Sequence, residues 1–177
     1  MRSLASALDV EAMSLYRYVD GRDALLDGVA EQLMSEIEPR GASSDWVVAV
    51  RGYAGSIRGL ARNHPQAFTM VALRALDSPS ALQPVEDLLA SLRRAGFTPA
   101  RAVAAFRTIA AFTQGYVLSE IAGFALPEET ASAERVGGRF PAIRSLARPL
   151  ASEPSDQGFR TALDTLIRGL QAEREPS

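Results

Sequence analysis

The chain has 177 residues, no cysteine and a formal net charge of -2. The absence of cysteine excludes disulfides, thiol catalysis and thiolate metal sites, and the small net charge means that any contact with DNA must come from a local patch. Because 47% of the residues are hydrophobic, the chain can bury the core of one compact domain, or of a small head on a larger body.

Hydrophobic residues recur with the period of an α-helix along the whole chain, and no segment alternates apolar and polar residues long enough to predict a strand. We therefore expect an all-α protein. Proline, glycine and capping residues divide the pattern into segments. After the first 19 residues, helices are predicted over 22–38, 45–63, a short stretch from Pro65, 80–96, 98–123, a short stretch after Pro141, and 156–172. Residues 127–139 are polar and contain glycine, which predicts a surface loop.

The last predicted helix carries a regular apolar seam. Phe159, Leu163, Leu166 and Leu170 follow one another at steps of four, three and four, which is the spacing of a helix that packs along a neighbouring helix. The seam can serve packing within one subunit or a dimer face, and the spacing alone leaves both open.

The first 19 residues have the pattern of two helices joined by a tight turn. Apolar residues fall where such a unit buries its side chains: Leu4, Leu8, Val10, Leu15 and Tyr18. The small residue Ala5 stands where the helices would cross. Asp9 stands at the turn, where a left-handed backbone is usual and aspartate tolerates it better than most residues. The second helix is predicted over residues 11–19.

The outward face of that second helix suits the major groove of DNA. An arginine such as Arg17 can donate to guanine O6 and N7, and Ala12 or Met13 can contact a thymine methyl group. Tyrosine and serine hydroxyls can bond phosphate oxygens. Arg22, with the free N–H groups at the start of the next helix, can hold a phosphate. The alternative interpretation is an ordinary helical hairpin whose tyrosines pack in the core.

Two stretches resemble a known family. LASALDVEAMSLYRYVDGRDALLDGVAEQL, residues 4–33, is similar to the DNA-binding segment of the TetR family of transcriptional repressors, and AAFTQGYVLSE, residues 110–120, is similar to the regulatory domain of its tetracycline-repressor-like branch. The resemblance implies a helix-turn-helix DNA-binding domain with its connecting helix at 1–40, and a ligand-binding and dimerisation domain at 41–177. It also implies these DNA-contacting residues: Arg2, Ser3, Ala12, Met13, Ser14, Tyr16, Arg17, Tyr18 and Arg22.

The same resemblance implies a further helix ahead of the helix-turn-helix. That helix is not found in residues 1–177, so we expect an incomplete head: either the true start lies upstream, or this is a shortened form with weak or no DNA binding. In addition, residues 1–40 contain four arginines and eight acidic residues, a net charge of -4, and neutralisation of phosphate charge dominates non-specific affinity for DNA. Two functions therefore stay open. One is a ligand-responsive transcriptional repressor, and the other is a helical small-molecule-binding dimer whose DNA binding is lost or weakened.

A small-molecule inducer is expected between helices of the body, where helical proteins place their pockets. The candidate lining residues are polar, aromatic or thioether groups within apolar helices: His64, Phe68, Met70, Arg74, Arg107, Phe112, Gln114, Tyr116 and Glu120. These residue types suit an apolar or aromatic inducer with an anionic or polar handle. In the alternative interpretation His64 is a helix-end residue before Pro65, and Arg74 and Arg107 are surface or salt-bridge residues.

Nothing in the sequence predicts an enzyme, a cofactor or a metal site, since there is one histidine, no serine paired with a base and no glycine-rich phosphate loop. The resemblance implies a homodimer whose interface is formed by residues 99–122 and 156–172 of each subunit. Its two heads would bind a palindromic double-stranded operator and release it when the inducer binds. Without a signal peptide or a bilayer-spanning stretch, the protein is expected in the cytoplasm, with no membrane partner.

Overall fold

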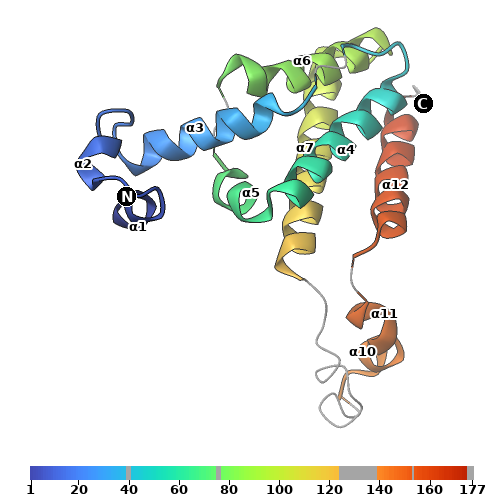
Figure 1. Cartoon of the computed structure of the whole chain (residues 1–177). Helices are drawn as coiled ribbons and strands as arrows, with labels where there is room; N and C mark the ends of the chain where they lie inside the picture. The colour runs from blue at the N-terminus through green and yellow to red at the C-terminus, as the bar shows by residue number, and fades with distance from the viewer. Residues whose placement is uncertain (39–40, 75–76, 124–138, 153, 175–177) are drawn as a thin grey trace. The chain divides into compact units, whose positions relative to one another are not determined.

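The computed structural model describes residues 1–38, 41–74, 77–123, 139–152 and 154–174 (Figure 1). Within these ranges every regular element is a helix, which confirms the predicted all-α class. The chain divides into two compact units, Met1–Ala110 and Ala111–Ser177. The expected boundary between DNA-binding and regulatory domains, after residue 40, stays a prediction. No helix in the described ranges is long and apolar enough to cross a membrane.

The first unit begins with three helices, α1 (Arg2–Ala7), α2 (Ala12–Leu15) and α3 (Arg22–Ser35). The start of α3 at Arg22 confirms the prediction, but α3 ends three residues earlier than expected, with Glu36 as its C-cap. One face of α3 is buried, through Leu26, Ala30, Leu33 and Met34. That face packs against α5 and α6, so the helix behind the head is anchored on the body.

Four helices build the rest of the first unit: α4 (Trp46–Asn63), α5 (Pro65–Val71), α6 (Pro79–Arg94) and the first half of α7 (Pro99–Ala122). Their starts follow from capping chemistry. The Asp45 carboxylate accepts from the Val47 N–H at 2.8 Å, as an N-cap does, and proline occupies the first helical position of α5 and α6. α4 packs on α6 through side chains with at most 1% exposure, including Val50, Leu88 and Leu92.

The second unit contains the end of α7, two short helices, α10 (Pro141–Ser145) and α11 (Ala147–Ala151), and the long helix α12 (Asp156–Arg174). Neither α10 nor α11 buries a residue within the chain. Residues 127–138, most of the predicted surface loop, lie outside the described ranges.

The apolar seam of α12 differs from the predicted one. Phe159, Leu163, Ile167 and Leu170 are buried, whereas Leu166 is only half-buried. The buried residues follow steps of four, four and three, so the buried stripe includes position 167 in place of 166. Since these side chains are buried within one subunit, the seam serves packing inside the chain.

The α4–α6 packing predicts a large difference between two leucines of α6. Leu92 is 0% exposed and Leu82 is 49% exposed. Leu92→Ala is expected to lower the free energy of unfolding by about 2–5 kcal/mol, because it leaves a cavity in a close-packed core. The control Leu82→Ala is expected to cost less than about 1 kcal/mol. Urea denaturation followed by circular dichroism measures both, and equal costs would contradict the packing described here.

Candidate DNA interface and ligand pocket

The helix-turn-helix begins with a tight turn between α1 and α2. Asp9 has φ +53°, so the predicted left-handed aspartate is confirmed. The Val10 N–H then donates to the Ala5 carbonyl at 3.0 Å, closing the turn. Ala5 is only 3% exposed, as expected for the small residue at the helix crossing.

The second helix is shorter than predicted. α2 covers Ala12–Leu15, not 11–19, and residues after it continue in tighter turns, where the Tyr18 N–H donates to the Leu15 carbonyl at 3.0 Å. The prediction that Leu8, Val10 and Tyr18 are buried is also wrong, because their exposed fractions are 56%, 44% and 87%. α1 has six residues and α2 has four, so each makes only one to two turns and covers little apolar surface.

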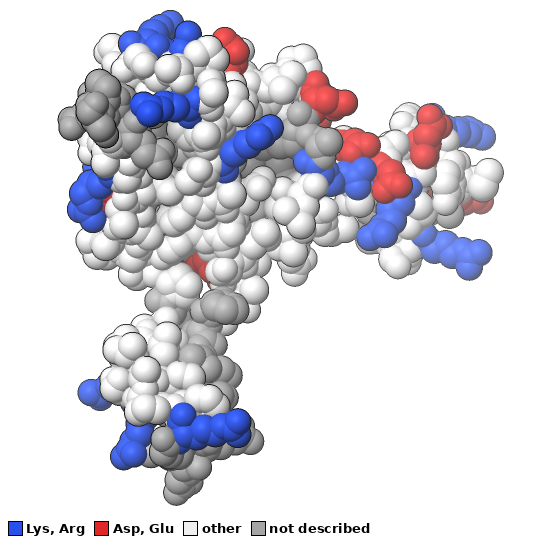
Figure 2. All heavy atoms as spheres, turned by 180° about the vertical axis from the view of Figure 1, so that it is seen from behind, with Lys and Arg blue, Asp and Glu red and all other residues white. Residues whose placement is uncertain are grey.

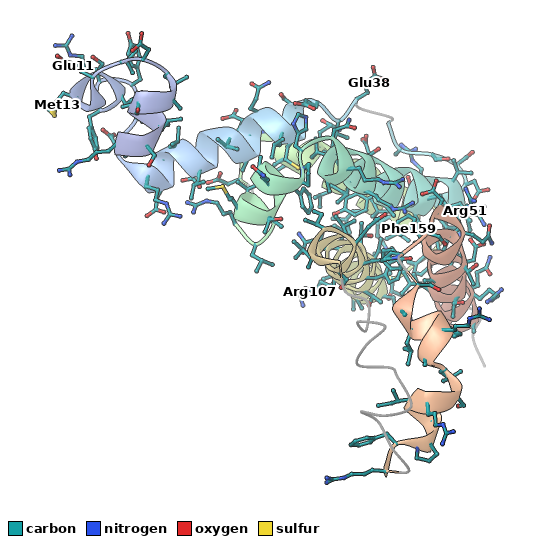
Figure 3. All side chains as sticks on the ribbon, turned by 60° about the horizontal axis from the view of Figure 1, so that its bottom comes forward. Glu11, Met13, Glu38, Arg51, Arg107 and Phe159 are labelled. Atoms are coloured by element: carbon teal, nitrogen blue, oxygen red, sulfur yellow. The ribbon has the colours of Figure 1, made fainter. Side chains whose placement is uncertain are left out.

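The expected DNA-contacting residues lie on these short helices and on the start of α3. Arg2, Ser3, Met13, Tyr16, Arg17, Tyr18 and Arg22 are exposed, and Ser14 is half-buried; the side chain of Ala12 lies outside the description. Met13 and Glu11 point outward from this head (Figure 3), and acidic and basic side chains are interleaved over its surface and along α3 (Figure 2). The head therefore presents isolated arginines rather than a continuous basic patch.

Two of the residues expected at the inducer site contact α3 and its C-cap. Arg74 donates from Nε to Asp27 Oδ1 at 2.8 Å, and a second guanidinium nitrogen lies 3.5 Å from Asp23 Oδ1. The hydrogen bond to Asp27 raises the pKa of Arg74. At the other end of α3, His64 Nε2 lies 2.8 Å from Glu36 Oε2. His64 also ends α4 and precedes α5, in line with the helix-end interpretation.

The other expected ligand residues are scattered. Phe68 is in the core at 5% exposure, whereas Met70 and Arg107 are exposed, and Arg107 points away from α7 (Figure 3). Gln114 and Glu120 are half-buried and already have interaction partners.

Only Phe112 and Tyr116 lie together, in a cluster with Phe159 whose ring centroids are 5.1–6.0 Å apart. They line a cavity of about 310 Å³ in the second unit.

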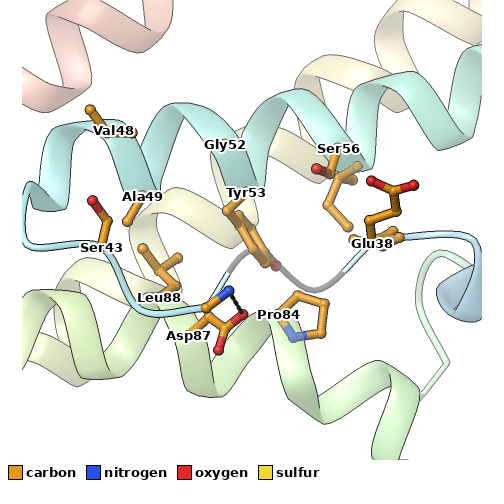
Figure 4. A pocket seen from close by; sticks show the side chains of 13 residues that line it. Glu38, Ser43, Val48, Ala49, Gly52, Tyr53, Ser56, Pro84, Asp87 and Leu88 are labelled. Carbon is orange, nitrogen blue, oxygen red and sulfur yellow. Dashed lines mark hydrogen bonds between the residues drawn. The ribbon is translucent and has the colours of Figure 1, made fainter.

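A larger cavity, of about 390 Å³, lies in the first unit between α4, α6 and the segment that joins α3 to α4 (Figure 4). None of the sequence-predicted residues lines it. Its lining residues are Ile37, Glu38, Gly41, Ser43, Val48, Ala49, Gly52, Tyr53, Ser56, Ile57, Pro84, Asp87 and Leu88. Most of the wall is apolar, with a few polar groups, which is the composition of small-molecule pockets.

Tyr53 and Asp87 supply polar chemistry from opposite walls of this pocket. The Tyr53 ring projects from α4 towards α6 (Figure 4), and its edge packs on Phe106 with ring centroids 6.3 Å apart. Burial raises the pKa of the Tyr53 phenol, so its hydroxyl stays protonated and able to donate. Asp87, on α6, is half-buried and accepts hydrogen bonds from the Gly41 N–H and from Gln83, both at 2.9 Å.

Residues 41–43, in the segment between α3 and α4, are held on α6 by hydrogen bonds. The Gly41 N–H donates to Asp87, as described above. The Ser43 N–H donates to Ser91 Oγ at 2.9 Å, and Arg94 donates to the Ala42 carbonyl at 2.8 Å. We call residues 41–43 the linker. Asp87 therefore belongs to both the pocket wall and the hold on the linker.

A helix-turn-helix head, joined by one helix to an all-helical body with a mostly apolar pocket, defines a ligand-responsive transcription regulator. The tetracyclin repressor-like C-terminal domain family matches residues 38–174, and the chain belongs to the TetR family.

Relatives and solved structures agree with this assignment. The chain is 28% identical to the HTH-type transcriptional repressor DrrR1 of Streptomyces coeruleorubidus, over 97% of this chain and 69% of the relative. It is 29% identical to the class A tetracycline repressor protein from transposon 1721 of Escherichia coli, over 98% and 81%.

Among solved structures, a possible TetR family transcriptional regulator from Streptomyces coelicolor A3(2) superposes with a TM-score of 0.86 at 30% identity, covering 98% of this chain and 89% of that one. ActR from Streptomyces coelicolor, in complex with (S)-DNPA, has a TM-score of 0.80 at 25% identity, covering 98% and 87%.

The left-handed turn predicts opposite effects for two substitutions at Asp9. Asp9→Gly is expected to keep or improve the stability of the head, because glycine adopts positive φ without strain. Asp9→Val is expected to destabilise the turn by at least about 1–2 kcal/mol, since a β-branched residue disfavours this conformation. Hydrogen exchange of the α1 and α2 amides, read by mass spectrometry, measures the difference. Equal protection in both variants would show that the turn does not depend on this backbone angle.

Proposed function

We propose that this protein is a repressor that binds a palindromic operator as a homodimer and releases it when an inducer occupies the pocket between α4 and α6. The observation that carries the proposal is the double role of Asp87, which lines the pocket and holds the linker behind the DNA-binding head. A ligand that changes the environment of Asp87 acts on the segment that connects pocket and head.

The DNA side rests on the exposed residues around α2. Arg17 is exposed and can donate two hydrogen bonds to a guanine edge in the major groove. Tyr16 is exposed, and its hydroxyl suits a phosphate oxygen. Arg22 at the start of α3 adds a cation where free backbone N–H groups already favour an anion.

The coupling runs through α3. This helix is held at one end by Arg74 and at the other by His64, and its C-terminal end leads into the linker on α6. A ligand in the pocket that favours a different linker position also favours a different position of α3. The resulting difference in operator affinity is the coupling free energy between the two sites, and it is reciprocal for binding.

The dimer face is proposed on exposed small residues of the second unit. Ala111 and Gly115 on α7, and Thr165 and Gly169 on α12, are exposed and spaced four residues apart on each helix. Small side chains at this spacing allow two helices to approach closely. This face is separate from the buried seam of Phe159, Leu163 and Ile167.

The charge balance favours a second candidate, a ligand-binding dimer with weakened DNA binding. Residues 1–40 carry a net charge of -4, which lowers the non-specific attraction to phosphate. A selection from randomised DNA duplexes separates the two candidates. Enrichment of a palindromic sequence supports the repressor, and no enrichment supports the second candidate.

Arg17→Ala tests the DNA face. With the palindrome obtained from the selection, the variant is expected to bind about 1–3 kcal/mol more weakly and to lose discrimination at the contacted base pair. Fluorescence anisotropy with labelled duplex measures the affinity. The control Arg144→Ala removes an exposed arginine of α10 and should leave affinity unchanged. Unchanged affinity of Arg17→Ala would remove this residue from base recognition.

Ala111→Arg tests the proposed dimer face. A long charged side chain in a close helix contact is expected to separate the subunits, so light scattering should give the mass of one chain for the variant and of two chains for the native protein. Gln66→Arg, at an exposed position of α5, is the matched control and should stay dimeric. A dimer that survives Ala111→Arg would place the interface elsewhere.

A further inference from the structure

Among the described residues that line the pocket between α4 and α6, the charged groups all have one sign. Glu38 and Asp87 are carboxylates, and no lysine, arginine or histidine is among the described lining residues. Glu38 lies at the same end of the pocket as Ser56, where it follows the end of α3, and Asp87 lies on the α6 wall (Figure 4). The pocket therefore has a negative potential at two places on its wall.

Neither carboxylate is neutralised within the described part of the chain. Both donors to Asp87, the Gly41 N–H and the Gln83 amide, are neutral groups. They stabilise the carboxylate without cancelling its charge. The arginine that reaches the linker, Arg94, donates to the Ala42 carbonyl. Glu38 is exposed and has no hydrogen-bond or ion-pair partner among the described residues.

The remaining wall suits the body of an aromatic or polycyclic molecule. Val48, Ile57, Pro84 and Leu88 are apolar, and the Tyr53 ring offers a π-face, which attracts cations as well as apolar rings. A volume of about 390 Å³ lies at the small end of the range for small-molecule sites, roughly 300–1,000 Å³. The pocket fits one compact ring system.

Resting on the proposed function, we propose that the inducer is a compact aromatic cation that donates a cationic N–H to Asp87, while Glu38 adds negative charge at a second place on the wall. An anionic handle, the expectation from sequence, would instead face two carboxylates. A cationic N–H that bonds Asp87 competes with the Gly41 N–H for the same carboxylate. Binding of the positive charge at Asp87 thus weakens the hydrogen bond that holds Gly41 of the linker. Asp87 then both selects a cationic ligand and couples ligand binding to the linker.

Three probes with the same tricyclic ring test the charge preference: 9-aminoacridine, which is a cation at neutral pH, neutral acridine, and anionic acridine-9-carboxylate. Binding to the protein is measured by equilibrium dialysis without DNA, because acridines intercalate. The cation is expected to bind at least about tenfold more tightly than the neutral ring, since a charge-assisted hydrogen bond contributes that much. The anion is expected to bind most weakly.

Isosteric variants test whether Glu38 and Asp87 cause the preference for the cation. Glu38→Gln and Asp87→Asn are each expected to weaken binding of 9-aminoacridine several-fold and to leave acridine binding within about twofold. Glu38 has no hydrogen-bond or ion-pair partner among the described residues. We therefore expect Glu38→Gln to fold even if Asp87→Asn does not. Glu86→Gln, on the neighbouring and exposed position of α6, is the matched control and should change nothing.

A pocket-filling variant separates this inference from the proposed function. Ala49→Phe places a ring inside the pocket and should abolish binding of all three probes, whereas Gly55→Phe adds the same ring to open space on α4. Equal or tighter binding of the anion, or a cation preference that survives Glu38→Gln, would overturn the ligand class. If Ala49→Phe still abolishes binding in that case, the pocket of the proposed function stands. Binding of no probe, or binding unaffected by Ala49→Phe, would contradict both.

Discussion

The packing of α4 on α6 is the constraint on which the pocket and the linker depend. One stripe of α4, with Val50, Ala54 and Ile57, is buried at 0–6% exposure and fixes the two helices against each other. The adjacent stripe carries Ala49, Gly52 and Ser56, at helical steps of three and four. Because these side chains are too small to fill the space beside the packed stripe, a cavity remains there, and its walls on α4 and α6 are held by the core beneath them.

Hydrogen bonds from α6 then determine where the chain enters the body. Ser91 is 0% exposed, yet its hydroxyl is satisfied on both sides, donating to the Asp87 carbonyl at 2.7 Å and accepting from the Ser43 N–H. A buried hydroxyl is costly unless its bonds are made, so this arrangement keeps the linker on α6. The path from the head to the body thus passes over the same helix that forms one wall of the pocket.

The sequence predicts the local features because local chemistry decides them. Asp9 at the turn, the Asp45 cap and the proline starts of α5 and α6 each follow from backbone preferences of single residues. The pocket could not be predicted in this way, because none of the candidate polar residues within apolar helices lines it; His64 pairs with Glu36, the C-cap of α3, and Arg74 with Asp23 and Asp27 of α3. The small residues at 49, 52 and 56, next to Tyr53, are the sequence feature that corresponds to the pocket. They enclose a cavity only because the linker passes over α6, and tertiary contacts determine that path.

The acidic side chains of α3 also change how the charge of the first 40 residues bears on DNA. Asp23, Asp27 and Glu36 are directed to Arg74 and His64 of the body, so the net charge of -4 overstates the repulsion felt by a phosphate backbone at the head. Asp9, Glu11 and Asp20 remain close to α2 and Arg17 in the sequence. A head of this kind gains little from neutralising many phosphates. In the proposed dimeric repressor, affinity for the operator would have to come mainly from a few base-edge contacts, which are short-ranged and would depend strongly on the spacing of the two heads. Small movements of α3 would then suffice to change the affinity for the operator, which is the property that a ligand-controlled repressor requires.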